Sequence, residues 1–210
     1  MQGSGQAPGH RHELAFRVEG IPWPPMPFHS GPATALMVLI LIAGTQKILD
    51  PSTTSGALAA ARLPASSLLV RILGVVEAAA AVAFLAEGGV IPAAVGAVLY
   101  AGFAWFVINA LARDLPISSC GCLGATETPP TLVHVVLNLI AVGVMTLAAI
   151  IPIAPLGGLL GQEMTTIVPH LLFTGVSVYM LYALLTVLPL VSKRARASLP
   201  TFLPSPRRGS

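Results

Sequence analysis

The stretch ASSLLVRILGVVEAAAAVAFLA, residues 65–86, decides the fold class of this chain. It is apolar over almost its whole length, and about 20 such residues let a helix cross the hydrocarbon layer of a bilayer. Backbone groups in lipid must pair within their own segment, so the stretch predicts a helix. Its alanine and glycine residues favour close contact with neighbouring helices. We therefore expect a transmembrane helix packed inside a bundle.

The composition of the whole chain agrees with a membrane protein. Of its 210 residues, 55% are hydrophobic and 9% are charged, and the mean hydropathy is +0.83. A soluble domain carries roughly 25% charged residues. The net charge of +3 could suit a nucleic-acid-binding protein. The basic residues lie mostly at the two ends, however, where they flank apolar spans, so we expect lipid and not nucleic acid as the partner of this chain.

Four further apolar runs have a similar length. They cover about 33–49, 91–112, 131–152 and 166–191. The breaks between the five runs contain dipeptides that mark turns, namely Asp50-Pro51, Gly88-Gly89, Pro129-Pro130 and Gly157-Gly158. The sequence therefore predicts an all-α integral membrane protein, in which a four-helix bundle is followed by a fifth, C-terminal transmembrane helix.

The same pattern divides the chain into four parts. Residues 1–31 form a tail that ends in the proline-rich sequence IPWPPMPFHSG, in which four prolines within six residues prevent a helix. This tail lacks the pattern of a signal peptide, so we expect the first span to stay in the mature protein. The remaining parts are a four-helix domain, a segment with the fifth helix, and a basic tail: 32–152 (with a loop at 113–130), 153–191 and 192–210.

Most polar residues of the predicted spans gather at one membrane face. Successive spans cross in opposite directions, so the loops after the first and third spans share a side. That side receives Cys120 and Cys122 and, within the spans, Lys47, Arg71, Asn109, His134 and Asn138. His134 and Asn138 are four residues apart and so share a helix face. Glu77 lies deeper, and His170 lies at the opposite side, where we expect a satisfied packing residue.

The charged residues of the spans admit structural and functional interpretations. Ionisable groups inside a membrane are costly and usually mark a function or an internal pair. Glu77 is therefore either a proton acceptor beneath the thiols or a buried carboxyl, alone or paired with Arg71, that holds helices together. For Lys47 and Arg71 we expect the charged ends to extend to the membrane surface.

Both cysteines of the chain lie one glycine apart in the loop sequence ISSCGCLGATETPP, residues 117–130. Inert, buried thiols are a poor match for a loop rich in Ser, Gly and Thr. As metal ligands, the two thiolates and His134 could hold zinc or copper(I). A closed zinc site needs four ligands, however, and Asp114 or Glu127 would have to complete it.

The third interpretation of the cysteines is a redox pair that cycles between dithiol and disulfide. Gly121 lets the backbone bend enough to bring the sulfurs of Cys120 and Cys122 together. Such a tight disulfide is strained and easily exchanged. His134 could deprotonate a thiol or stabilise a thiolate. We favour this interpretation, in which the electrons pass to another protein's cysteines or to a bound cofactor such as a quinone.

Several elements resemble one family of membrane proteins when they are taken in order. They are AGTQKILDP at 43–51, Pro64, VVEAAAAV around Glu77, CGCLG at 120–124 and HVVLN ending at Asn138. Together they resemble the MauE family of methylamine-utilisation membrane proteins, a family related to DoxX-like four-helix proteins. The resemblance covers about residues 33–150, and the C-G-C-x-G element is its most specific part.

The resemblance implies a function in disulfide formation in the bacterial cytoplasmic membrane. MauE-like proteins act beside the thioredoxin-like MauD during maturation of the cysteine-rich small subunit of methylamine dehydrogenase, and other relatives serve thiol redox with other partners. The redox role would fall on the two cysteines. Other residues match family positions that have no established role, namely Glu77, Lys47 and Asn138. The chain departs from the family at Leu123, commonly Phe, and at Leu137, often Arg.

Two arguments give opposite orientations for the cysteine loop. Thiol exchange belongs on the oxidising side, which places residues 113–130 outside the cell, and the family resemblance favours that side. The five Lys and Arg of residues 192–210 place the C-terminal tail, and with it the loop, in the cytoplasm. Two competing functions stay open at this point: a transporter for a metal or small solute, and a non-catalytic DoxX-like scaffold for a redox enzyme.

Overall fold

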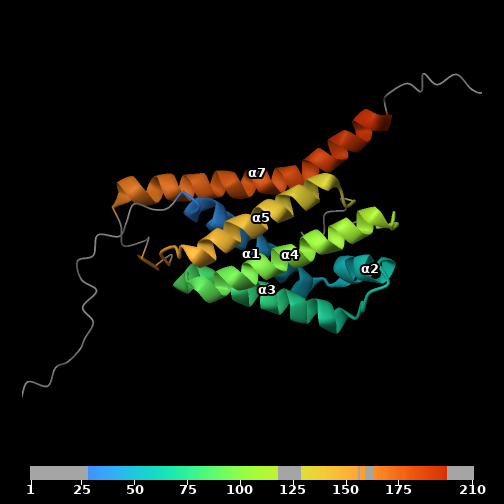
Figure 1. The fold of residues 1–210 in the computed structure, drawn as a ribbon, viewed down its shortest axis with the longest axis horizontal. Coiled ribbons are helices and arrows are strands. Elements are labelled where there is room, and N and C mark those ends of the chain that lie inside the picture. Colours follow the sequence, from blue (N-terminus) through green and yellow to red (C-terminus); the bar gives the residue numbers. More distant parts are fainter. Residues whose placement is uncertain (1–27, 118–128, 156, 159–162, 198–210) are drawn as a thin grey trace, which may run out of the picture.

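The computed structural model describes residues 28–117, 129–155, 157–158 and 163–197 (Figure 1). Cys120 and Cys122 lie outside these residues. The described part of the chain is all-helical and contains no strand. Its helices are α1 (Ser30–Leu49), α2 (Ser52–Ala60), α3 (Ser67–Glu87), α4 (Val90–Ala112), α5 (Leu132–Ile150) and α7 (Met164–Ala197).

Five of these helices are long and apolar enough to cross a bilayer: α1, α3, α4, α5 and the part of α7 from Met164 to Val187. The prediction of an all-α protein with five spans is confirmed. The chain is therefore a multi-pass membrane protein. The largest difference is in α7, which was expected over 166–191 and continues to Ala197.

The short helix α2 was not predicted from the sequence. Two residues, Asp50 and Pro51, separate it from the end of α1, and a carboxylate oxygen of Asp50 accepts a hydrogen bond of 3.0 Å from the backbone N–H of Ser52. The hydroxyl and backbone of Ser52 hold the pKa of the Asp50 carboxyl below its ordinary value. The Asp-Pro break therefore does not lead directly into a loop, because it starts a second helix.

Consecutive long helices run antiparallel, so their ends collect at two opposite sides of the bundle (Figure 1). One side holds the C-terminal ends of α1 and α4, the N-terminal ends of α3 and α5, and all of α2 (Figure 1). We call this side the α2 end. The two described residues that flank the cysteine segment, Ile117 and Pro129, follow α4 and precede α5 at this end. The arrangement agrees with the parity argument from the sequence.

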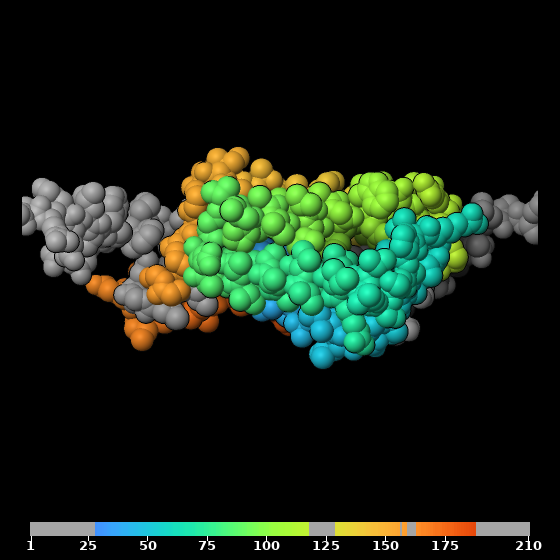
Figure 2. Space-filling view, turned by 90° about the horizontal axis from the view of Figure 1, so that it is seen from below, coloured from blue at the N-terminus to red at the C-terminus, as the bar shows by residue number. Residues whose placement is uncertain are grey.

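Helix α1 forms the centre of the bundle. It packs most extensively against α3 and also contacts α5 and α7, while α4 packs mainly against α5. The core between these helices contains Met37, Ile40, Phe84, Tyr100 and Met145. Large apolar side chains cover the outer surfaces, as expected for helices that face lipid. The view in Figure 2 shows one such surface, formed by α3 and α4 with α2 at one end.

Candidate functional site

A buried ion pair joins α1 to α3. The ammonium nitrogen of Lys47 lies 2.8 Å from the Oε2 atom of Glu77 and donates a hydrogen bond to it. The two residues are 1% and 0% exposed. Removing two charges from water is costly, and the attraction between them offsets that cost only when the pair has good geometry. The pair is therefore a specific feature of this bundle and not a surface contact.

Two glycines allow this pair to form. Gly44 lies three residues before Lys47, and Gly74 lies three residues before Glu77, so each glycine shares a helix face with its charged residue. A Cβ atom at Gly44 would lie 2.6 Å from the carbonyl oxygen of Gly74, and one at Gly74 would lie 2.6 Å from that of Gly44. The helices thus touch backbone to backbone, as small residues permit in membranes.

Lys47 and Glu77 differ in the contacts that they make outside the pair. The ammonium group of Lys47 also lies 5.4 Å from the ring centre of Phe103 in α4, which is within the range of a cation–π interaction. The second carboxylate oxygen of Glu77, Oε1, is buried and has no hydrogen-bond partner in the described part of the structure. The pair is therefore held by one direct hydrogen bond and one aromatic ring.

The structure corrects two expectations about the charged residues. Glu77 was considered alone or paired with Arg71, but its partner is Lys47. Lys47 was expected to extend to the membrane surface, but it is buried, because its ammonium group turns inward to the carboxylate. Arg71 is exposed, and the expectation that its charged end extends to the membrane surface stays a prediction.

A second polar cluster lies in the first turns of α5. The Nδ1 atom of His134 lies 2.9 Å from the hydroxyl oxygen of Thr131, and the side-chain nitrogen of Asn138 donates a hydrogen bond of 2.7 Å to the carbonyl of His134. The backbone of Leu185 in α7 also interacts with the His134 ring. His134 and Asn138 are both buried. Their described contacts fix the start of α5 and connect it to α7.

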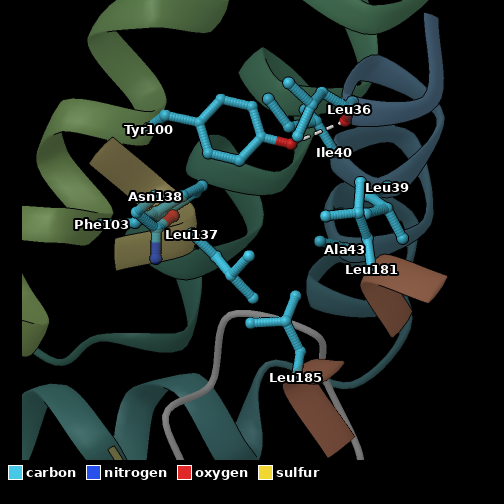
Figure 3. A pocket seen from close by; sticks show the side chains of 10 residues that line it. All are labelled: Leu36, Leu39, Ile40, Ala43, Tyr100, Phe103, Leu137, Asn138, Leu181 and Leu185. Carbon is cyan, nitrogen blue, oxygen red and sulfur yellow. Dashed lines mark hydrogen bonds between the residues drawn. The ribbon is translucent and has the colours of Figure 1, made fainter. Parts of the chain in front are cut away.

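The two clusters lie at the same end of the bundle, and among the residues that the structure describes no hydrogen bond joins one cluster to the other. Phe103 lies between them. It faces Lys47 on one side, and with Asn138 it lines a small cavity of about 40 Å³ between α1, α4, α5 and α7 (Figure 3). The hydroxyl of Tyr100, at the same cavity, donates a hydrogen bond of 2.7 Å to the carbonyl of Leu36 (Figure 3). Sequence reasoning did not single out Phe103.

The chain that leads toward the cysteines packs on α2. Ile117 is buried in a cluster with Ala57 of α2 and Ala110 of α4. Asn109, one turn before the end of α4, donates a hydrogen bond to the carbonyl of Trp105 in its own helix. The cysteines and Glu127 lie outside the described residues. The approach to the cysteine segment therefore starts at the same end as both polar clusters.

Other sequence-based expectations concern a metal and the far end of the bundle. Within the described ranges, no three His, Cys, Asp or Glu side chains are grouped closely enough to hold a metal ion. His170 is buried, as expected, but its Nε2 atom has no hydrogen-bond partner in the described part of the chain. Within the described residues, the expectation that the polar atoms of His170 have hydrogen-bond partners is therefore not met.

Comparison with known proteins confirms the resemblance seen in the sequence. A family model described as methylamine utilisation protein MauE matches residues 27–154 of the 210-residue chain. The match begins just before α1 and ends just after α5, so it includes both polar clusters and the cysteine segment. No curated protein and no solved structure matches the chain.

Proposed function

The chain belongs to the MauE family of methylamine utilisation proteins, and on this premise we propose that it is a membrane thiol–disulfide redox protein of the bacterial cytoplasmic membrane. Membership itself implies a role in methylamine utilisation. In our proposal Cys120 and Cys122 exchange electrons with a thioredoxin-like, MauD-like partner. The observation that carries the proposal is the C-G-C sequence, the chain's two cysteines, placed between α4 and α5.

The chemistry requires nothing beyond two dithiol–disulfide pairs. A thiolate of one cysteine attacks a sulfur of the partner's disulfide, forms a mixed disulfide and releases a partner thiolate. The second cysteine then attacks the mixed disulfide, which leaves a Cys120–Cys122 disulfide and a reduced partner. Two electrons and two protons move in total, and the reverse sequence transfers them back. Gly121 supports this cycle because it removes the side chain from the middle of a very small ring.

Two features at the α2 end support this proposal, namely His134 and the Lys47–Glu77 pair. His134 begins α5, the helix that follows the cysteine segment, and we propose that it accepts the proton of an attacking thiol. Glu77 takes a different role in our proposal, because its carboxylate is held by Lys47. We propose that this pair fixes α3 against α1 and so positions the end of the bundle that faces the partner.

Trapping of the mixed disulfide tests the proposal directly. The Cys120→Ser and Cys122→Ser variants, expressed in membranes with thioredoxin-like proteins, should differ on non-reducing gels. The variant that keeps the attacking cysteine should accumulate a mixed disulfide that disappears on reduction. The double variant contains no cysteine and is the matched control. If alkylation shows that both cysteines stay reduced under every growth condition, the proposal fails.

The same two cysteines can report the orientation of the loop. Because the sequence has no other cysteine, a membrane-impermeant maleimide can label no other thiol of this chain. Labelling of intact spheroplasts is expected, since thiol exchange belongs on the oxidising side. Labelling that appears only after the membrane is opened would agree with the charge of the C-terminal tail and would contradict the periplasmic location.

A further inference from the structure

A larger cavity opens at the α2 end, between α1, α2, α3 and α4. Its volume is about 290 Å³. The lining residues are almost all apolar, and they are Lys47, Thr54, Ala57, Leu58, Leu63, Leu73, Val98, Leu99, Gly102, Phe103, Trp105 and Phe106. No motif in the sequence indicated this cavity, because its wall is assembled from four helices.

The cavity faces lipid along α4. Val98 and Trp105 line it and are 70% and 56% exposed on the outer surface of that helix. Gly102 lies between them, and a Cβ atom added there would meet nothing within 4 Å. In a bilayer this rim is in contact with acyl chains, so a lipid-soluble molecule could enter from the side without crossing a polar surface.

Lys47 gives this apolar cavity a charged end, and Thr54 is the other polar residue in the lining. Lys47 is the charged residue among the described lining residues, and its ammonium group carries three donor hydrogens, of which Glu77 accepts one. Since the Lys47–Glu77 pair is neutral as a whole, a bound acid would meet an adjacent carboxylate and be repelled. A neutral ligand with a carbonyl oxygen is the better match for this end.

The aromatic residues of α4 favour a planar ligand. Phe103, Trp105 and Phe106 all line the cavity, and aromatic faces pack well against flat rings. Ligand pockets usually measure about 300–1,000 Å³. At about 290 Å³ this cavity lies at the lower edge of that range, so it has room for one substituted ring. An attached chain would have to leave through the rim of Val98 and Gly102 into lipid. The cavity thus combines a ring-sized interior, a lining that includes Lys47 and a lateral opening.

We propose that this cavity binds the head group of a quinone dissolved in the bilayer, with a ring carbonyl accepting a hydrogen bond from Lys47. A quinone takes up two electrons and two protons to become a quinol, which is the number that oxidation of a dithiol to a disulfide releases. The electron-accepting role rests on the proposed thiol redox function, whereas binding of the ring depends on the cavity alone. No such site is assigned by the family match.

Fluorescence of Trp105 provides a direct test of binding. The chain has two tryptophans, and a Trp23→Phe background leaves Trp105 as the single reporter. Decylubiquinone titrated into this protein in lipid nanodiscs should quench Trp105 with a saturable curve. Gly102→Leu adds a side chain at the rim of the cavity and should weaken the saturable quenching at least tenfold. Gly143→Leu, at an equally open glycine on the exposed surface of α5, is the matched control and should bind as the parent does.

Two results would overturn the proposal. The first is quenching that never saturates, or that is equal in the two leucine variants, since the quinone would then only partition into lipid. The second is loss of the saturable quenching when a saturated hydrocarbon as long as the decyl chain is added at the concentration of decylubiquinone. The cavity would then bind alkyl chains and not rings.

The proposed thiol function can fail separately. A Cys120→Ser, Cys122→Ser protein should keep the saturable quenching, because the cavity residues are unchanged. If it binds decylubiquinone while wild-type cysteines prove inert, the quinone site stands and the redox function fails. If thiol exchange with a partner is observed while Trp105 quenching never saturates, the quinone site alone fails.

Discussion

The buried ion pair gives the most quantitative prediction. Lys47→Met and Glu77→Met each remove one partner and leave the other charge inside the bundle, where Lys47 is 1% and Glu77 is 0% exposed. Breaking a buried pair in this way costs about 3–5 kcal/mol. Each single variant should therefore lose about 3–5 kcal/mol of stability.

The double variant should behave differently. With Met at both positions 47 and 77, no charge remains buried and the side-chain volumes change little. Replacement of a buried pair by apolar residues is often neutral or stabilising. We therefore expect the double variant to unfold within about 1 kcal/mol of the parent, so that the coupling energy between the two sites is at least about 3 kcal/mol. A large loss of stability in each single variant, together with almost none in the double variant, would show that the two charges are paired.

Equilibrium unfolding in mixed micelles of dodecyl maltoside and SDS, followed by far-UV circular dichroism, measures these differences. Arg71→Met is the matched control, since it removes a cation from the same end of the bundle at an exposed position. Its effect should stay below about 1 kcal/mol. A double variant as unstable as the worse single variant would show that packing, and not charge pairing, explains the losses. Single variants as stable as Arg71→Met would show that the pair does not form.

Three further substitutions test other contacts by the same unfolding measurement. Gly44→Ala places a Cβ 2.6 Å from a carbonyl oxygen and should cost about 1–3 kcal/mol, whereas Gly102→Ala meets nothing within 4 Å and should stabilise its helix by up to about 1 kcal/mol; equal effects would contradict the close contact. Tyr100→Phe removes the hydroxyl that donates to the Leu36 carbonyl and should cost about 0.5–1.5 kcal/mol, and no loss would place that hydrogen bond in question. Asn138→Leu loses a bond to a carbonyl of its own helix and should change stability by less than about 1.5 kcal/mol, so a larger loss would reveal a further partner.

The spans could be predicted because lipid imposes a length and a composition that are visible locally. Residues 65–86 correspond to α3 within two residues at each end, since the Gly88-Gly89 break ends the helix in left-handed backbone that glycine adopts readily. Helix α2 was missed for the opposite reason. Its nine residues, STTSGALAA, are too short to span a bilayer, and they show no apolar stripe that would predict a helix.

The sequence predicted the membrane face at which the polar residues gather, but it did not predict their contacts. Parity alone placed Lys47, His134 and the cysteine loop at one end, and the described residues agree. Parity cannot tell which side chains turn inward, so Lys47 was assigned to the surface. One signal was available: Gly-x-x-Lys at 44–47 and Gly-x-x-Glu at 74–77 share the same spacing. Two helices that touch through their glycines bring the following charges together.

The close contact of α1 with α3 lies beside the cavity. Gly44 and Gly74 let α3 pack closely against α1, α3 packs less extensively against α4, and the cavity lies between these helices at the α2 end, so we expect its width to depend on the α1–α3 contact. A methyl group at Gly74 should push α3 toward α4, which would weaken both the ion pair and quinone binding. Gly102→Leu should weaken binding alone. A Gly74→Ala protein that loses stability yet quenches Trp105 with the parent's affinity would break this link between helix contact and cavity.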